Sequence, residues 1–311
     1  MKDMIDNLNL KILRIRFFTE QHIRMKYWIG AVLRNRFLYV AESVYVNETM
    51  SLRRIIETLP LSEEHFMFRQ LQEGFPKGFL FDCSDLPYDG SGFVLRPNTI
   101  YCFSLILIGK LITYQASFLE AISRMINDGF GHPMVSLELV DVTEGDLCVL
   151  PDLILKENRF ETLELVFKTP VSLMHLPKGK GSGFQNKLNN FPSFYQFMRS
   201  LMYRVVTLGI LYSDGISFEN RKEMDEWIEE YIAPSMKAVL LQANLCYEKR
   251  YSTPKVGETS VYSMAGYTGR LIFGKVHSDY LPLLSALSPL GVGSDVNYGL
   301  GTFRVSYRSG Y

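Results

Sequence analysis

The stretch GVGSDVNYGLGTF, Gly291–Phe303, contains two G-x-G pairs separated by five residues. Each pair encloses an aliphatic residue, Val292 in the first and Leu300 in the second. Glycine loses more backbone freedom on folding than any other residue, so this density indicates a turn or a close approach that needs glycine. The following segment, Thr302–Tyr307, is typical of a β-strand. The sequence therefore predicts a glycine-rich turn that leads into a closing strand.

The spacing of these glycines differs from that of two common phosphate-binding motifs. It is not the Rossmann pattern G-x-G-x-x-G, and no G-K-[ST] follows, so it is not a P-loop. Glycines at a helix–strand connection can still let a polyanion approach main-chain N–H groups. A tight turn without any ligand is the alternative interpretation.

Composition sets wide limits on the fold and on the partners. The chain has 311 residues, 47% of them apolar, which is enough for one large core or two ordinary domains. Its 33 basic and 33 acidic residues cancel, so any polyanion binding must come from local patches.

Cysteine usage and hydropathy favour a soluble cytoplasmic protein. The four cysteines never form C-x-x-C, which favours reduced, mostly packed thiols. The start, MKDMIDNLNLK, carries charge where a signal peptide would be apolar, and no apolar run approaches the roughly 18 residues of a membrane span. No histidine, aspartate and glutamate cluster has metal-ligand spacing. We expect no membrane partner, no metal and no cofactor.

Hydrophobic periodicity predicts the same order of elements in both halves. In the first half we expect strands and helices at Leu10–Phe18 (strand), Tyr27–Ala41 (helix), Thr99–Gly109 (strand), Ser117–Asp128 (helix) and Met134–Val142 (strand). In the second half we expect Leu163–Met174 (a strand broken or placed at an edge by Pro170), Ser193–Leu211 (helix), Ser260–Val276 (a hairpin bent at its glycines), Tyr280–Leu290 (helix) and Thr302–Tyr307 (strand).

These two βαββαβ units predict an α+β fold of tandem ferredoxin-like, RRM-like domains with antiparallel sheets. We place the N-terminal domain at residues 1–157 and the C-terminal domain, with the glycine-rich turn, at residues 158–311. A single α+β domain and two domains of unlike fold are the alternatives.

The C-terminal half resembles the CRISPR precursor-RNA processing endoribonucleases of the RAMP superfamily. That family carries a G-h-G-x5-G-h-G loop near its C-terminus, where h is hydrophobic, and residues 291–301 match it position for position. Weaker similarities span about residues 10–308. They are Tyr251-Ser252, the glycines of Gly266–Gly269, the WIGAVLRNRF stretch of the first helix, and the strand Phe103–Gly109 with its following helix and Gly-Phe-Gly turn.

One departure from the family lies in the loop spacer, Ser294–Tyr298. Many members carry a lysine or arginine there, whereas this chain carries Asp295, which would repel phosphate. The resemblance therefore implies RNA contact mainly through the backbone of the four glycines, Gly291, Gly293, Gly299 and Gly301.

The resemblance implies metal-independent RNA cleavage, in which a 2′-hydroxyl attacks the adjacent phosphate and leaves a 2′,3′-cyclic phosphate. Such a reaction needs a base, an acid and a cation. Family members place catalytic residues around the first helix, where this chain has His22 as candidate base, Tyr27 as acid or orienting group, and Lys26 or Arg24 as cation. A polar strand–helix connection is the alternative.

His65 is the rival catalytic histidine, because some members keep theirs after the first helix. Glu63 and Glu64 beside it favour a solvated helix face instead. For His132, His175 and His277, a packed or surface role is the favoured interpretation, with His175 as an RNA contact the alternative.

RNA affinity would come from local cations. The candidates are Arg24, Arg34, Arg36, Arg53, Arg54, Lys178, Lys180, Lys187, Lys249 and Arg250. Three of them lie in the glycine-rich segment Leu176–Lys187, which reads either as a loop that closes over phosphates or as a solvated loop. Tyr251 or Tyr298 could stack on a base.

Three functions follow from these features. The leading one is a sequence-specific endoribonuclease that binds CRISPR repeat RNA, with CRISPR effector or adaptation proteins as further partners, acting as a monomer or homodimer. The second is a non-catalytic RAMP subunit that holds guide RNA, and the third is a family-free RNA-binding or protein-interaction module. A long hairpin thumb would favour the subunit. The only candidate, Ser136–Phe160, is short, which favours the nuclease.

Overall fold

The computed structural model describes residues 8–72, 74–90, 92–129, 135, 137–148, 160–173, 191–214, 216–253 and 261–308. The elements of the N-terminal unit are β1 (Leu10–Thr19), β2 (Ile23–Met25), α2 (Ile29–Ala41), β3 (Tyr45–Asn47), β4 (Met50–Ser51), α3 (Leu52–Glu57), α4 (Phe68–Gln72), β5 (Phe79–Asp82), β6 (Phe93–Leu95), β7 (Thr99–Ile108), α5 (Gln115–Asp128) and β8 (Glu138–Cys148). Those of the C-terminal unit are β9 (Phe160–Val171), α6 (Phe194–Tyr212), α7 (Arg221–Ile232), β10 (Val239–Tyr251), β11 (Ser263–His277), α8 (Tyr280–Leu287) and β12 (Phe303–Arg308).

The two units repeat one topology. The N-terminal sheet has the order β5-β7-β1-β8 and the C-terminal sheet the order β10-β11-β9-β12, with every neighbouring pair antiparallel. Numbered within its unit, each sheet has its second, third, first and fourth strands side by side. This is the ferredoxin-like βαββαβ arrangement twice over, and it confirms the predicted α+β fold with antiparallel sheets.

The strand β1 shows why the sequence forms these sheets. Leu13, Ile15 and Phe17 are buried, while Arg14 and Arg16 between them are exposed, so the alternation places one face on the core. The strand pairs with β7 along its whole length and with β8 on its other side, which makes it central.

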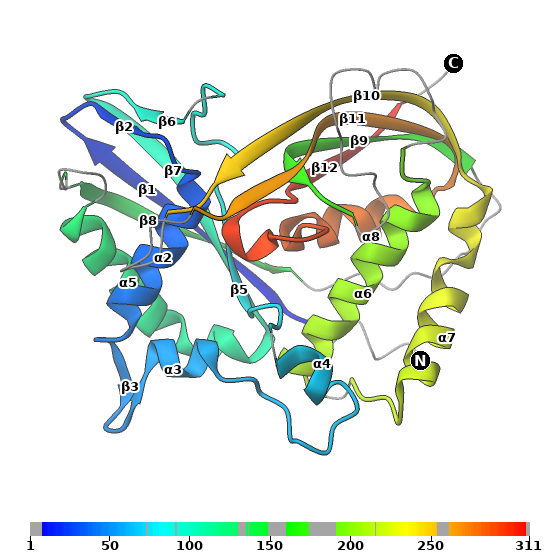
Figure 1. Ribbon diagram of the computed structural model, residues 1–311, viewed down its shortest axis with the longest axis horizontal. Coiled ribbons are helices and arrows are strands. Elements are labelled where there is room, and N and C mark those ends of the chain that lie inside the picture. Colours follow the sequence, from blue (N-terminus) through cyan, green and yellow to red (C-terminus); the bar gives the residue numbers. More distant parts are fainter. Residues whose placement is uncertain are drawn as a thin grey trace.

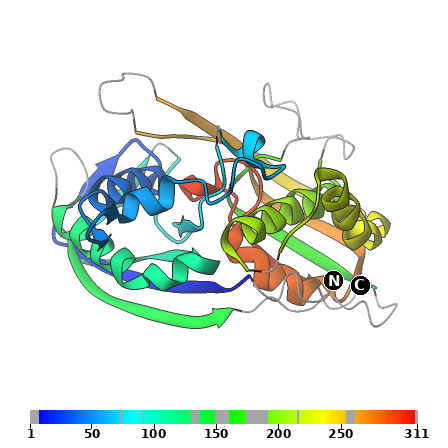
Figure 2. The ribbon, with the colours of Figure 1, turned by 90° about the horizontal axis from the view of Figure 1, so that it is seen from below.

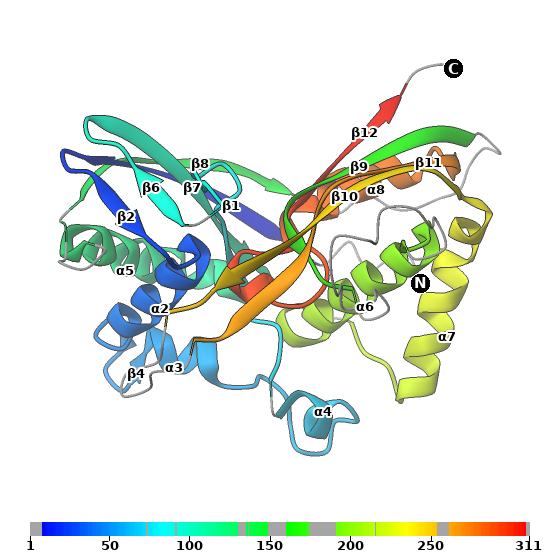
Figure 3. The ribbon, with the colours of Figure 1, turned by 45° about the horizontal axis from the view of Figure 1, so that its top comes forward.

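The helices cover one side of both sheets (Figures 1 and 3). Seen from below, α2 and α5 lie side by side against the N-terminal sheet, and α6 lies beside α7 (Figure 2). The helix α6 begins with a capping box between Ser193 and Gln196 and buries thirteen of its nineteen residues. It is therefore a core helix of the C-terminal unit.

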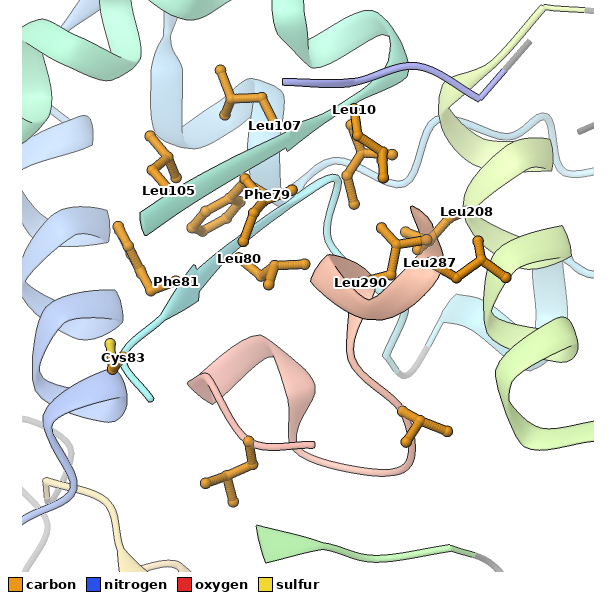
Figure 4. Packing of buried hydrophobic residues seen from close by; sticks show 14 of the residues in the cluster. Leu10, Phe79, Leu80, Phe81, Cys83, Leu105, Leu107, Leu208, Leu287 and Leu290 are labelled. Atoms are coloured by element: carbon orange, nitrogen blue, oxygen red, sulfur yellow. The ribbon is translucent and has the colours of Figure 1, made fainter. Parts of the chain in front are cut away.

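The buried apolar residues of both units form one continuous cluster. Figure 4 shows members from the N-terminal unit, such as Leu80 and Phe81 of β5, together with Leu208 of α6, Leu287 of α8 and Leu290 just after it. The interface between the units is thus part of the hydrophobic core, and burial of this surface opposes their separation.

Three details differ from the expectations. The hairpin predicted at Ser260–Val276 is wrong, because β11 runs through Gly266 and Gly269 and its hairpin partner is β10, which the sequence did not reveal. At Pro170 the predicted break is confirmed, because the register with β11 shifts between Phe167 and Val171 and pairing with β12 ends at Phe167. The alternative of an edge strand is wrong for residues 163–167, which pair on both sides. The helix α7 was also not predicted.

The predicted boundary between residues 157 and 158 lies outside the described residues, in 149–159, and stays a prediction.

Candidate functional site

The glycine-rich element lies against the N-terminal unit. The indole Nε1 of Trp28 donates a hydrogen bond of 2.6 Å to the main-chain oxygen of Tyr298. A Cβ on Gly30 would lie 2.1 Å from that same oxygen, and one on Gly299 would lie 2.6 Å from the carbonyl oxygen of Phe81. Only glycine permits such approaches, so the element is a joint between the two units.

The glycines also set the path of the turn. Gly291, Gly293, Gly299 and Gly301 have φ values of 64°, 90°, 75° and 74°, in the region that favours glycine. The turn is closed by a hydrogen bond from Val292 N–H to the carbonyl of Gly301, 3.0 Å long, and tied to β9 by one from Gly301 N–H to the carbonyl of Pro170, also 3.0 Å.

Three of these glycines, Gly291, Gly299 and Gly301, are buried. Ser294 is the exposed residue of the spacer, and Asp295 beside it is half-buried. Backbone contact between the element and RNA stays a prediction, and its accessible part is the spacer rather than the buried glycines.

A cation lies among aromatic rings beside this joint. The guanidinium carbon of Arg250, in β10, is 3.5 Å from the ring centroid of Tyr88 and 5.5 Å from that of Trp28. Arg250 also forms an ion pair with Glu248. The main-chain N–H of Trp28 donates a hydrogen bond to the carbonyl oxygen of Tyr251, 2.8 Å away, so the end of β10 is fixed to the start of α2. Figures 1 and 3 show β10 reaching across to α2.

Two further basic residues contact the spacer, Arg34 through its side chain and Lys77 through its main chain. The guanidinium carbon of Arg34 lies 4.8 Å from the ring centroid of Tyr298, and the main-chain N–H of Lys77 donates to Oδ1 of Asn297 at 3.3 Å. Burial lowers the pKa of Arg34, an effect opposed by Tyr298 and Glu57. Burial lowers the pKa of Lys77 to about 8, with Arg34 lowering it further and Glu57 opposing both. Partly desolvated cations of this kind favour an anionic ligand.

The predicted catalytic segment lies at the start of α2. His22 is exposed directly before β2, and the ammonium of Lys26 lies 5.3 Å from the ring centroid of Tyr27. Arg24 pairs with Asp89 at 3.2 Å. The segment leads into Trp28 and so borders the joint. The catalytic roles of these residues stay predictions.

His65 lies elsewhere in the N-terminal unit. Its ring stacks on Phe66 with centroids 4.7 Å apart, its Nδ1 accepts from Met67 N–H at 3.2 Å, and burial lowers its pKa. It precedes α4, where Gln70 accepts a hydrogen bond from Arg221 of α7. Figures 1 and 3 show α4 well apart from β2 and β6. The structure does not bring the two candidate histidines together.

The remaining predicted cations are dispersed. Arg36 pairs with Asp128 at 3.0 Å, and Lys249 is exposed on β10. Arg53 pairs with Glu57 at 2.8 Å and, with Arg54, lines a hollow of about 580 Å³ beside α3. Several predicted residues lie outside the described ones: Lys178, Lys180, Lys187, His132 and His175.

His277 is buried, and its Nδ1 accepts from the N–H of Asp279 at 3.3 Å. This contact supports the packed role that the sequence favoured for it.

A pocket of about 310 Å³ lies between β11 and the spacer. It is lined by Val171, Ser172, Tyr247, Tyr262, Ser263, Ala265, Gly266, Tyr267, Ser294 and Asp295. The hydroxyl of Tyr262 donates to Oδ1 of Asp295 at 3.1 Å. Burial raises the pKa of Asp295, and the hydrogen bonds from Tyr262 and Ser294 oppose this.

Neither a metal cluster nor a membrane span emerges from the described part of the chain. There, no group of three or more His, Cys, Asp or Glu side chains could hold a metal ion. No helix within those residues is long and apolar enough to cross a bilayer.

Sequence reasoning missed Lys77, Tyr88 and Tyr262 as parts of this region. Each is a single residue outside any motif, and each meets its partners only through the fold. The composition around Tyr88 and Tyr262 carries no signal that could have singled them out.

Comparison with known proteins places these features in a family. The family model described as CRISPR-associated endoribonuclease Cas6 matches residues 165–303, and one described as an N-terminal domain matches residues 8–164. No curated protein sequence matches the chain.

Solved structures agree in fold. A Cas6 product complex is 16% identical to this chain, covers 96% of it and 100% of its own length, and has a TM-score of 0.52. A partial Cas6-RT-Cas1–Cas2 complex is 10% identical, covers 98% of this chain and 47% of that one, and has a TM-score of 0.58.

Proposed function

Because the chain belongs to the family of CRISPR-associated endoribonucleases described as Cas6, we propose that it binds CRISPR repeat RNA and cuts the precursor transcript into guide RNAs. The match of residues 165–303, which contain the docked glycine-rich element, carries this proposal. Nuclease activity is the property of the family. The substrate and the chemistry below are the proposed part.

The proposed reaction is a transesterification without a metal ion. A general base takes the proton of the 2′-hydroxyl, and the 2′-oxygen forms a bond to the adjacent phosphorus. The bond from phosphorus to the 5′-oxygen breaks, and a general acid protonates the leaving oxygen. A nearby cation stabilises the charge that develops on the phosphate. The products are a 2′,3′-cyclic phosphate and a 5′-hydroxyl.

We assign the base role to His22, with Tyr27 as acid or orienting group and Lys26 as cation. The exposed imidazole of His22 is accessible to RNA, and its segment borders the joint where Arg250 and Tyr88 lie. His65 is the alternative base. Its lowered pKa favours the neutral imidazole that a base requires, but it lies apart from the joint.

The RNA would follow the border between the units. Arg34, Lys77 and the exposed Lys249 supply positive charge along it, whereas the buried Arg250 is paired with Glu248. Contacts of this kind release counterions, so affinity would fall as salt rises. The zero net charge of the chain suits one shaped RNA rather than any polyanion.

The alternative is a non-catalytic RAMP subunit that binds guide RNA. The described part of residues 136–160 includes β8, which pairs with β1 inside the N-terminal sheet. This pairing places residues 138–148 in the sheet rather than in a thumb, which supports the nuclease over a subunit whose thumb would include them. Adaptation proteins are a further proposed partner class, because one similar structure is a Cas6-RT-Cas1–Cas2 complex.

The test uses purified protein and end-labelled CRISPR repeat RNA in EDTA. We expect cleavage at one position, and we expect a 2′-deoxy substitution at that position to abolish it. Tight binding without cleavage would instead favour the non-catalytic subunit. Cleavage that requires added Mg²⁺ would contradict the proposed chemistry.

A further inference from the structure

The side chains that line the pocket beside Asp295 suit the binding of a flat ring. The small residues Ala265 and Gly266 leave room on one side, and the rings of Tyr247 and Tyr262 line it. These two rings are 37% and 54% exposed, so each offers apolar surface to an incoming group. The volume of about 310 Å³ lies at the lower end of the range typical of small-ligand sites.

The charged side chain among those that line this pocket is the carboxylate of Asp295. A carboxylate only accepts hydrogen bonds, so Asp295 excludes phosphate and selects groups that present N–H or O–H donors. This explains how an acidic residue can serve an RNA-binding protein in the position of a spacer cation. It would read a base edge rather than hold the backbone.

The carboxylate is held in place by its neighbours. Oδ1 accepts from the Tyr262 hydroxyl at 3.1 Å, and Oδ2 accepts from the Ser294 hydroxyl at 3.4 Å. A carboxylate has about four lone-pair positions, so each oxygen can accept one more hydrogen bond. The backbone of Asp295 is fixed at a φ of 59° inside the turn, which restricts its movement further.

Guanine is the nucleobase that matches two parallel acceptors. Its Watson–Crick edge presents N1–H and N2–H side by side, whereas adenine and cytosine present one amino group beside an acceptor. Unpaired bases in RNA are recognised in this way, by stacking on aromatic side chains and by hydrogen bonds to the exposed edge.

We propose that this pocket takes up one unpaired guanine of the bound RNA, with Asp295 accepting hydrogen bonds from its N1 and N2 and the exposed tyrosine rings packing on its faces. This inference rests on the proposed function for the identity of the ligand as RNA. It makes Asp295 a specificity-determining residue outside the cleavage chemistry.

The experiment measures equilibrium binding of fluorescein-labelled heptauridines in which the central nucleoside is replaced by guanosine, inosine or adenosine. We expect the guanine oligomer to bind about tenfold more tightly than the adenine oligomer, since charged hydrogen bonds are stronger than neutral ones. Inosine lacks the N2 amino group and should lie between them. The RNA is recovered and checked for integrity.

The deciding variant is Asp295→Asn, because asparagine tolerates positive φ and should leave the turn intact. We expect it to bind the guanine and adenine oligomers equally well. Asp214→Asn, on a side chain 90% exposed, removes the same charge elsewhere and should keep the preference. Tyr247→Ala should weaken all oligomers alike.

Two outcomes would contradict the proposal that this pocket binds guanine. One is a guanine preference that survives in Asp295→Asn, and the other is equal or unmeasurable binding of all oligomers by the unmodified protein. Cleavage of the full repeat RNA is scored separately. A protein that cuts the repeat without a base preference contradicts only the pocket, and one that prefers guanine but never cuts contradicts only the nuclease.

Discussion

Trp28 donates its indole N–H to the main-chain oxygen of Tyr298 over 2.6 Å, across 270 residues of sequence. Gly30, near Trp28 on the same helix, leaves room for that oxygen, and Arg34 one turn later covers the Tyr298 ring. One residue of the glycine-rich element is thus held by three residues at the start of α2. Tyr298 is therefore one of the points at which the two ferredoxin-like units are fixed to each other.

Gly30→Ala tests this joint. The added methyl group would lie 2.1 Å from the Tyr298 oxygen, so the helix and the turn must move apart. We expect the free energy of unfolding to fall by about 2 kcal/mol, as for other overpacked sites. Urea denaturation measures it. Gly74→Ala is the control, because a Cβ there meets nothing within 4 Å. Equal stability of the two variants would contradict the account.

Trp28→Phe removes the donor but keeps an aromatic ring. The Tyr298 carbonyl loses its partner and the smaller ring leaves a gap, so we expect a loss of about 2 kcal/mol in the free energy of unfolding. Trp227→Phe is the matched control, since Trp227 stacks on Tyr231 away from the joint and should cost less. A larger effect from Trp227 would refute the ranking.

Lys77 predicts a pH dependence of stability. Its pKa is lowered to about 8, mainly by burial, so between about pH 8 and the ordinary lysine value the unfolded chain binds more protons than the folded one. The free-energy cost of burying the Lys77 ammonium is therefore fully present below about pH 8. It falls as pH rises, because Lys77 then loses its proton in the folded protein.

Lys77→Gln removes this titration. We expect urea unfolding from about pH 7 to about pH 10 to show the unmodified protein gaining stability relative to the variant. A difference between the two that stays constant over this range would show that Lys77 titrates normally.

His22→Ala should slow RNA cleavage by a factor of about a hundred to ten thousand, the usual contribution of a general base. Because His22 is exposed, the variant should unfold at the same temperature as the unmodified protein. Single-turnover cleavage in EDTA measures the rate. His65→Ala is the comparison. If His65→Ala loses cleavage activity while His22→Ala keeps it, the assignment of His22 as the base is contradicted and His65 is the base instead.

Much of the fold could be predicted from periodicity. The alternation in β1 and the apolar stripe of α5 are strong local signals, and the repeated order of elements predicted the twin topology. The strand β10 was not predicted, because apolar and polar residues do not alternate regularly along it and because Leu241 and Tyr247 are exposed. Gly266 looked like a turn residue, but it lies within β11, where glycine is needed because a Cβ would lie 2.5 Å from the main-chain oxygen of Val171.

The site was less predictable than the fold. The glycine spacing indicated the family, and Arg250 was predicted as an RNA-binding cation, without its position beside the joint. The partners that define its surroundings, Tyr88 and Trp28, come from another unit and meet it only after folding. Contacts of this kind leave no trace in local sequence. In the sequence Asp295 was a departure from the family pattern, whereas in the structure its carboxylate lines a pocket.

The central claim is that this chain cuts RNA by attack of a 2′-hydroxyl. The most direct test is mass spectrometry of the fragments released from CRISPR repeat RNA in EDTA. We predict that the upstream fragment ends in a 2′,3′-cyclic phosphate and the downstream fragment begins with a 5′-hydroxyl. An upstream 3′-hydroxyl with a downstream 5′-phosphate, the mark of attack by water on the other side of the phosphate, would contradict it.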